Sequence, residues 1–289
     1  MYDFDVQGNG SIEIASSAQI SPEIQVIFQS PGRITIGDYC VIGPGVKFVC
    51  AGGDVTIGDW TTLHDRCLVL SGEGVQIGAH CWFGQNSVID GTGGITIGRG
   101  VRVGMYSQLW SHVAAGEQIE GCTLFGERPV VIEDDVWLVG SCIVASGVTV
   151  GRRSVALIGS NITKSCGSNT VLAGSPAAPK PNLSFYRDIT LDEKWKALEG
   201  WLREIAMNIG AISEKNESKG THALRLDLDF SGGLIIFNRD TATAFSTRLQ
   251  YPEATVCCVE DKTYNKRLTT IEYKVLKPLS GNKARFNSI

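Results

Sequence analysis

The stretch that decides the fold is Ile77–Leu109, which reads IGAHCWFGQNSVIDGTGGITIGRGVRVGMYSQL. Large apolar residues recur in it at every sixth position, and most are followed directly by glycine. They are Ile77, Phe83 and Ile89, and then Ile97, Val103 and Leu109. A period of six matches neither the helical period of about 3.6 residues nor the alternation of a strand. It predicts a solenoid in which three hexads make one triangular coil.

The same period continues on both sides of this stretch. The further predicted inward positions are Ile14, Ile20, Val26; Ile36, Ile42, Phe48; Ile57, Leu63, Val69; Ile132, Leu138, Val144; and Val150, Ala156, Ile162. Because equivalent positions stack from coil to coil, we expect them to form one continuous apolar interior. The glycines beside them are expected to allow the sharp corners. Extra residues enter only after the third hexad, so loops are expected to leave at one corner.

One interruption is much longer than the others. Ile97 and Ile132 begin consecutive coils but stand 35 residues apart, which predicts a projecting loop over Trp110–Val131. Long loops on rigid scaffolds often carry function. His112 lies just beyond the last inward position, where a histidine could take a proton at neutral pH. The alternative is a solvated loop histidine. The candidates to orient its ring are Glu117, Glu120 and Glu127.

Composition excludes several classes of protein. The 289 residues are 43% hydrophobic and 19% charged, as in ordinary globular proteins, and the net charge of -4 argues against a nucleic-acid partner. We expect no transmembrane segment, because no apolar run is long enough, and no signal peptide, because the N-terminus lacks a basic region and an apolar core. Nine cysteines without a C-x-x-C pair indicate reduced thiols and a cytoplasmic location.

The character of the chain changes near residue 181, after three closely spaced prolines. We expect the solenoid domain at 1–181 and a small α+β domain at 182–289, for which recognition of a substrate is one expected role. Thr190–Glu193 resembles a capping box, and the apolar stripe that follows to Ile209 predicts a helix packed on its own domain, with a trimeric helical seam as the alternative. The expected strands are 224–230, paired as a hairpin with 234–237 across the turn at 231–233, and then 254–260 and 268–276.

The segment Val130–Pro179 resembles a known family of enzymes. It contains VWL at 136–138, GS at 140–141, SGVTVG at 146–151, ITK at 162–164 and VLAGSPA at 171–177. This run is similar to the hexapeptide-repeat acyltransferases of the maltose, galactoside and streptogramin acetyltransferase group, and the hexads extend the resemblance over about residues 10–181. The resemblance implies a mainly β fold, a left-handed parallel β-helix, and a homotrimer with coenzyme A bound between neighbouring solenoids. It also implies that His112 is the general base.

Further site residues follow from the same resemblance. Backbone amides at Gly140 and Ser141, and at Gly159 and Ser160, would contact the pantetheine arm of acetyl-coenzyme A. Trp137 would lie beside the groove, with Thr163 and Lys164 at its end and Lys164 next to the coenzyme phosphates. Asn86 matches an asparagine that contacts the acceptor sugar; a corner asparagine that satisfies the backbone is the equal alternative.

The expected activity is therefore acetyl-coenzyme A-dependent O-acetylation of a sugar hydroxyl on a glycan or polysaccharide precursor, without a metal. One alternative is N-acetylation of an amino sugar or nucleotide-linked sugar. Another is a non-catalytic β-helix that acts as a scaffold or binding module. A zinc enzyme of the γ-carbonic anhydrase type shares the architecture but needs three convergent histidines. The four histidines, His64, His80, His112 and His222, do not fall in one register.

Overall fold

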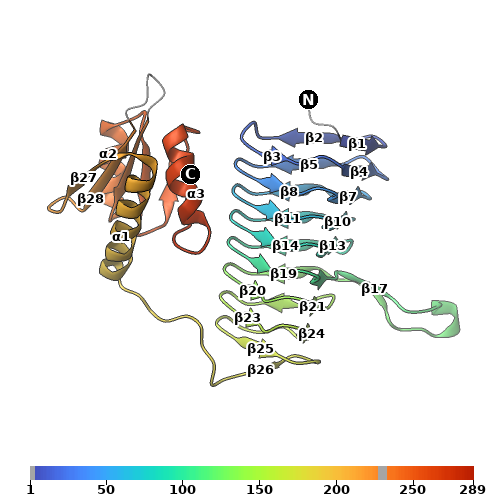
Figure 1. Cartoon of the computed structure of the whole chain (residues 1–289). Helices are drawn as coiled ribbons and strands as arrows, with labels where there is room; N and C mark the ends of the chain where they lie inside the picture. The colour runs from blue at the N-terminus through green and yellow to red at the C-terminus, as the bar shows by residue number, and fades with distance from the viewer. Residues whose placement is uncertain (1–3, 227–232) are drawn as a thin grey trace. The chain divides into compact units, whose positions relative to one another are not determined.

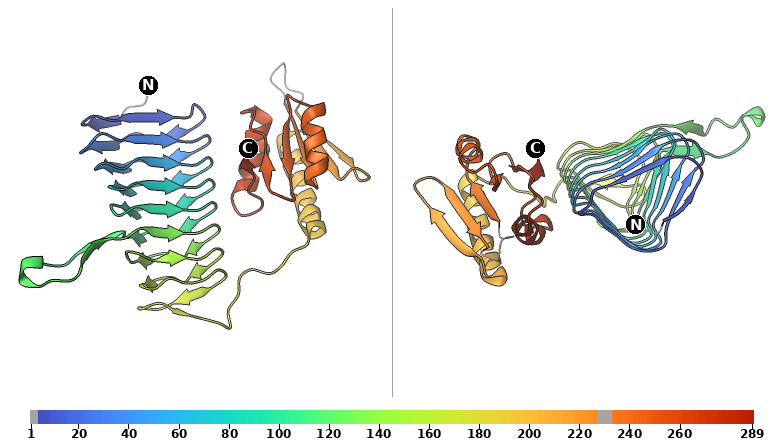
Figure 2. Two further views of the ribbon diagram at one scale, coloured as in Figure 1. Left: turned by 180° about the vertical axis from the view of Figure 1, so that it is seen from behind. Right: turned by 90° about the horizontal axis from the view of Figure 1, so that it is seen from above.

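The computed structural model describes residues 4–226 and 233–289. The chain divides into two units, Met1–Arg187 and Asp188–Ile289, which we call the solenoid and the C-terminal unit. The solenoid is a stack of triangular coils, seen from the side in Figure 1 and along its axis in the right-hand view of Figure 2. Its three faces are sheets of parallel strands, as the six-residue period predicted, except that the last strand of one face pairs antiparallel to its neighbour.

The chain visits the three faces in a fixed order, B, C and then A. Face A contains β1 (Phe4–Gln7), β4 (Ile24–Phe28), β7 (Lys47–Cys50), β10 (Leu68–Ser71), β13 (Val88–Gly91), β16 (Gln108–Leu109), β21 (Ile143–Val144) and β24 (Asn161–Ile162). Face B contains β2 (Ser11–Ile14), β5 (Arg33–Ile36), β8 (Val55–Ile57), β11 (Val75–Ile77), β14 (Ile95–Ile97), β19 (Val130–Ile132) and β22 (Thr149–Val150). Face C contains β3 (Gln19–Ile20), β6 (Val41–Ile42), β9 (Thr62–Leu63), β12 (Trp82–Phe83), β15 (Arg102–Val103), β20 (Trp137–Leu138), β23 (Val155–Ala156), β25 (Val171–Ala173) and β26 (Ala178–Pro179).

The register of these strands confirms the predicted interior. Ile57, Ile77 and Ile97 are aligned across β8, β11 and β14, and the other predicted columns align in the same way. All predicted inward residues are buried except Ile14 and Ile20, which are half-buried because they belong to the first coil and have neighbours on one side only. The structure also adds a partial coil that the sequence did not predict, in which Leu172 stacks on Ala156.

The glycines beside the inward residues have a different role from the expected one. A Cβ atom on Gly104 would lie 2.1 Å from the carbonyl oxygen of Val139 in the next coil, and one on Gly78 would lie 2.8 Å from the backbone of Gly98. The left-handed corner positions lie elsewhere in each coil, and both residues with side chains, such as Trp60 (φ 63) and His80 (φ 60), and other glycines, such as Gly100 (φ 70), occupy them. The glycines beside the inward residues are therefore required by the close approach of successive coils.

The long interruption forms a projecting arm, as predicted. Strand β17 (His112–Ala114) leaves the corner after face A, a short 3₁₀ helix η1 (Gln118–Glu120) follows, and β18 (Phe125–Glu127) returns antiparallel to β17. Both figures show the arm extending away from the coils. His112 is the first residue of β17, so it lies where the arm joins the solenoid.

The C-terminal unit is a mixed sheet with three helices. Its elements are α1 (Leu191–Ile209), β27 (Ile212–Asn216), β28 (Thr221–Arg225), β29 (Leu234–Asn238), α2 (Thr241–Gln250), β30 (Thr255–Cys258), β31 (Thr263–Tyr264), α3 (Thr270–Ser280) and β32 (Asn287–Ser288). The strands lie in sequence order. None of the helices in the two described ranges combines the length and apolar character needed to cross a membrane.

Most of the predictions for this unit are confirmed. The capping box at Thr190 and Glu193 begins α1, whose buried residues include Leu198, Leu202 and Ile205, and α1 packs on α3 and β27 of its own unit. β28 and β29 pair as an antiparallel hairpin, and β30 lies within 254–260. The predicted strand residues 227–230 and the turn residues 231 and 232 lie outside the described residues.

The predicted strand at 268–276 is wrong, because this segment forms α3. Thr269 caps the helix by accepting a hydrogen bond from the Glu272 amide at 3.3 Å. Ile271, Val275 and Leu279 are all buried and four residues apart, which is a helical spacing. Helix α2 was not predicted; it begins at its cap, Asp240, which accepts a hydrogen bond from the Thr243 amide.

Candidate active site

The predicted site residues gather at two corners of the solenoid that border face A. The chain turns from face C to face A at one of them, which contains Asn86, Gly140, Ser141 and Gly159. It turns from face A to face B at the other, which contains His112, Thr163 and Lys164. We call these the C–A corner and the A–B corner.

The A–B corner contains a carboxylate–imidazole pair. His112 Nδ1 lies 2.7 Å from Asp90 Oδ2, which belongs to the preceding coil. The Asp90 side chain is fully buried, whereas the His112 side chain is 37% exposed. The Trp110 ring lies edge-on to the imidazole with ring centroids 5.9 Å apart. The pair therefore has a fixed inner end and an accessible outer end.

Further hydrogen bonds hold Asp90 in place. Its Oδ2 accepts from the Ser111 amide at 2.8 Å, the Ser111 hydroxyl at 3.1 Å and the His112 amide at 3.2 Å. Its Oδ1 accepts from the Thr92 hydroxyl at 2.5 Å and the Thr92 amide at 3.2 Å. Burial acts to raise the pKa of the Asp90 carboxyl, but the hydrogen bonds from Thr92, His112 and Ser111 outweigh it and lower that pKa below its ordinary value. Asp90 is therefore ionised at neutral pH.

An ionised Asp90 determines the tautomer of His112. A carboxylate without its proton can only accept hydrogen bonds, so the hydrogen between the two residues belongs to Nδ1 of the imidazole. Nε2 then carries a lone pair at the exposed end of the ring. A carboxylate that orients a histidine in this way also stabilises the imidazolium that forms when Nε2 takes a proton. The arrangement has the geometry of a general base.

The three predicted orienting glutamates do not hold the His112 ring. Glu117, Glu120 and Glu127 are exposed on the arm, and although Glu127 stands opposite His112 in the pairing of β17 with β18, the hydrogen-bond partner of the ring is Asp90. The sequence contains a signal that would have identified Asp90. The residues aligned with it in the earlier coils of face A are Gln7, Ile27, Val49 and Leu70. A carboxylate that follows three apolar residues in this column, one coil before the arm, marks the site.

The C–A corner is more open and less preorganised. Asn86 has a left-handed backbone (φ 58), and its Oδ1 accepts a hydrogen bond from Arg66 Nε at 3.0 Å. A Cβ atom added to Gly159 would meet nothing within 4 Å, so the space beside it is free. Ser141 is exposed, with φ 48. These residues present a surface on which a ligand could lie.

The predicted use of backbone amides at this corner needs correction. The amide of Ser141 donates to the Met105 carbonyl at 2.8 Å, that of Gly159 to the Gly140 carbonyl at 2.9 Å and that of Ser160 to the Leu157 carbonyl at 3.2 Å. They cannot also donate to a pantetheine arm without losing these bonds. Ser160 is in addition fully buried, with its hydroxyl 2.5 Å from the Leu157 carbonyl. The amide of Gly140, the fourth predicted contact, makes no such hydrogen bond within the described residues, so it remains for ligand contacts together with side chains and carbonyl oxygens.

The other predicted coenzyme contacts are exposed. Trp137 lies on β20 of face C, three residues before Gly140, and is 47% exposed. Thr163 and Lys164 follow β24 at the A–B corner and are exposed. In the register of face A, Ala145 aligns with Thr163 and Ser146 with Lys164, because Val144 pairs with Ile162. Lys164 and His112 therefore belong to the same corner, two coils apart.

A metal centre finds no support in these residues. Within 4–226 and 233–289, no group of three or more His, Cys, Asp or Glu side chains is arranged to hold a metal ion. His64 packs against Trp82, with ring centroids 5.0 Å apart. His222 belongs to the C-terminal unit, where its Nε2 lies within hydrogen-bond distance of the Ser213 hydroxyl.

Comparison with known proteins places the repeat in a family. Residues 74–105 match the family described as "Hexapeptide repeat of succinyl-transferase". The chain is 24% identical over 165 residues to the "Putative colanic acid biosynthesis acetyltransferase WcaF" of Escherichia coli, covering 57% of this chain and 66% of that protein. It is 27% identical over 163 residues to the galactoside O-acetyltransferase of Lactococcus lactis, covering 56% of this chain and 70% of that enzyme.

A solved structure with the same type of repeat is also similar. The polysialic acid-specific acetyltransferase NeuO has 21% identity and a TM-score of 0.46, with 64% of this chain and 83% of that chain covered. The chain spans just under two thirds of the length of WcaF. The chain therefore contains the hexapeptide repeat and is similar in sequence to proteins named as acetyltransferases.

Proposed function

We propose that the protein transfers an acetyl group from acetyl-coenzyme A to a sugar hydroxyl of a glycan or polysaccharide precursor. The observation that carries this proposal is the Asp90–His112 pair, with an ionised, fully buried carboxylate behind an exposed Nε2. Acyl transfer from a thioester to an alcohol requires a base for the alcohol proton. The relatives named as O-acetyltransferases support the hydroxyl rather than an amine as the acceptor.

The reaction needs only one protein base. Nε2 of His112 accepts the proton of the acceptor hydroxyl as its oxygen bonds to the thioester carbonyl carbon. The carbon–sulfur bond then breaks, and the proton on Nε2 passes to the departing thiolate, which leaves as coenzyme A. Asp90 keeps Nδ1 protonated and stabilises the positive charge on the ring between the two proton transfers. No protein nucleophile takes part.

The positions of Asn86 and His112 support a homotrimer. They lie at opposite corners of face A, at the start and beyond the end of the strands that cross it. One acceptor can reach both most directly where the C–A corner of one copy meets the A–B corner of the next. Acetyl-coenzyme A would then lie along this junction, past Trp137, Ser141 and Gly159, with its phosphates near Thr163 and Lys164.

A cytoplasmic location is part of the proposal. The nine cysteines all lie in the described residues and form no disulfide, and thiols that stay reduced are typical of a reducing compartment. Acetyl donors and nucleotide-linked sugar precursors would be available to the enzyme there.

An acceptor screen with acetyl-coenzyme A tests the proposal. The purified chain is incubated with mono- and oligosaccharides and with amino sugars, and mass spectrometry detects products that gain an acetyl group. We expect O-acetylated products that lose the acetyl group under mild alkali. Alkali-stable acetylation of amino sugars would instead establish the N-acetyltransferase alternative.

Calorimetry separates the enzyme from the scaffold alternative. Coenzyme A is titrated into the wild-type chain and into a Lys164→Ala variant. We expect saturable binding that the substitution weakens. No binding at millimolar coenzyme A, together with no product in the screen, would leave the non-catalytic scaffold as the correct interpretation.

A further inference from the structure

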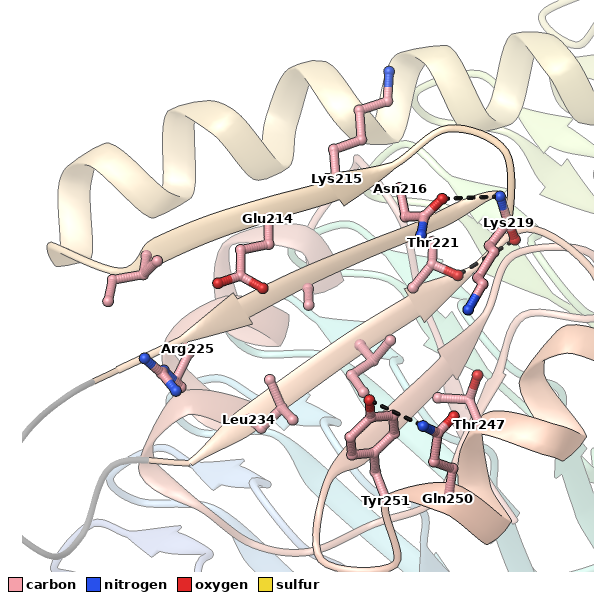
Figure 3. Close-up of a pocket in the computed structure, with 13 residues that line it drawn as sticks. Glu214, Lys215, Asn216, Lys219, Thr221, Arg225, Leu234, Thr247, Gln250 and Tyr251 are labelled. Carbon is pink, nitrogen blue, oxygen red and sulfur yellow. Dashed lines mark hydrogen bonds between the residues drawn. The ribbon is translucent and has the colours of Figure 1, made fainter.

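The C-terminal unit contains a hollow that the proposed chemistry does not use. Its volume is about 500 Å³, and it lies on one face of β27, β28 and β29 beside the end of α2. Figure 3 shows Glu214, Arg225 and Leu234 on the strands and Tyr251 and Gln250 on the segment opposite them. The Lys215 side chain points away, toward α1, where its Nζ lies 3.0 Å from Glu199.

Strand register explains the lining. Three rows cross the strands on this face: Ile212, Arg225 and Leu234; Glu214, Ala223 and Ile236; and Asn216, Thr221 and Asn238. The first two rows combine apolar or small residues with a charged group, and the third row is entirely polar, so the floor changes from amphipathic to polar along its length. The hollow exists because α2, ten residues long, packs on β29 and β30 and leaves β27 and β28 uncovered on this face.

The hollow continues into a second one, of about 680 Å³. The residues common to both are Lys219, Thr221, Thr247 and Gln250. Beneath this junction, Asn238 Oδ1 accepts hydrogen bonds from the Thr221 hydroxyl at 3.1 Å and the Thr247 hydroxyl at 3.2 Å. Asn238 is fully buried, yet its Nδ2 has no hydrogen-bond partner. Through its Oδ1, Asn238 holds the two lining hydroxyls of Thr221 and Thr247 in place from below the junction.

The charges around the two hollows are nearly balanced. Lys215 is paired with Glu199 and Glu217, and Arg239 is paired with Asp192. Glu214 faces the first hollow together with Lys219 and Arg225. Recognition of phosphate groups uses converging cations, whereas this lining has more amides and hydroxyls than cations. It suits a ligand rich in hydroxyl groups with little net charge.

We infer that this trough, made of the two hollows, binds an oligosaccharide segment of the acceptor, away from the sugar that is acetylated. Tyr251, 42% exposed, offers a ring for the apolar face of a sugar. Asn216, Thr221, Thr247 and Gln250 offer amides and hydroxyls to its hydroxyl groups, and Glu214 and Lys219 offer charged partners. The elongated shape fits several linked sugars. The link between this binding and acetylation rests on the proposed function, whereas the binding of an oligosaccharide does not.

Direct binding to the full chain tests the inference. A glycan array first identifies hexasaccharides that bind. Fluorescence anisotropy then measures the affinity for labelled neutral hexasaccharides, such as maltohexaose, and for labelled acidic ones, namely a sialic acid hexamer and a hyaluronan hexasaccharide. We expect at least one to bind, and Tyr251→Ala and Glu214→Gln each to weaken binding about tenfold. The matched control is Leu249→Ala on the outer side of α2, 70% exposed and outside the lining; it should change nothing.

Kinetics then distinguish this inference from the proposed function. With a hexasaccharide acceptor, Tyr251→Ala should raise KM about tenfold; with a monosaccharide acceptor, kcat and KM should be unchanged. His112→Ala should lose transfer but still bind the labelled hexasaccharide. The inference is overturned if no hexasaccharide binds the wild-type chain, or if Leu249→Ala weakens binding as much as Tyr251→Ala. Binding without any acetyl transfer would uphold the trough and refute only the enzyme.

Discussion

The two corners that border face A differ in how they are built. At the A–B corner, hydrogen bonds from Thr92, Ser111 and His112 converge on the fully buried Asp90. At the C–A corner, Ser141 is exposed, Gly159 is open, and their amides are already used inside the solenoid. One corner is preorganised for proton transfer, and the other offers an accessible surface. The proposed function accordingly assigns the chemistry to the A–B corner and ligand placement to both corners.

The largest expected effect is at His112. His112→Ala removes the base and should lower kcat by roughly 10³-fold, within the range typical for loss of a general base. Coenzyme A affinity and the melting temperature should stay close to wild type, because the side chain is partly exposed. Steady-state assays, calorimetry and thermal denaturation measure these quantities.

The matched control is His64→Ala, another solenoid histidine, which packs against Trp82 on face C. It should retain wild-type kcat. Near-normal turnover in His112→Ala would remove the distinction between the two corners.

Asp90→Asn should have the next largest effect. The substitution keeps the shape but removes the charge that fixes the Nδ1–H tautomer, so kcat should fall on the order of 10²-fold with little change in either KM. The comparison is Asp54→Asn, an exposed aspartate whose Oδ1 accepts the Arg33 amide at 2.8 Å. If KM for both substrates rises while kcat is unchanged, Asp90 serves folding of the corner and does not position His112.

Stability should respond to pH through the same residue. The pKa of Asp90 is lower in the folded chain than its ordinary value, so its ionised form stabilises the fold above that ordinary value. This stabilisation is lost as the pH falls through the folded-state pKa. The melting temperature of wild type should therefore exceed that of Asp90→Asn at pH 7, with the gap closing toward pH 3. A difference in melting temperature that does not change with pH would show that the charge of Asp90 does not stabilise the fold.

The contrast between the corners also explains what the sequence could predict. The columns of inward-facing residues could be predicted because seven coils repeat the same six-residue pattern, and each coil confirms the period of the others. Asp90 occurs once, and its role depends on a contact with the next coil that no local pattern reports. The α3 segment was misread for a related reason. A short run of apolar residues such as 268–276 fits either period, and only the Thr269 cap distinguishes a helix.

Lys164→Ala should have a moderate effect confined to the coenzyme. Loss of one charged contact to a phosphate should raise KM for acetyl-coenzyme A about tenfold and leave kcat unchanged. Lys180→Ala is the control, since Lys180 is also exposed in the solenoid but lies beyond the A–B corner. An equal effect of both substitutions would mean that only the general charge of the surface matters.

The smallest effect, and the most direct test of the two-corner arrangement, comes from mixing defective copies. His112→Ala abolishes the function of the A–B corner. Asn86→Ala removes one polar contact with the acceptor at the C–A corner and should lower the rate of transfer about tenfold.

The two variants are co-expressed in equal amounts. If one site uses both corners of a single chain, this mixture should show about a twentieth of the wild-type rate. If each site joins corners of neighbouring copies in a cyclic trimer, about a quarter of the sites regain both intact residues. The rate should then reach about a quarter of wild type, roughly fivefold above the other outcome. Separate preparations mixed after purification, without subunit exchange, should stay at the lower value, which makes the gain specific to shared sites.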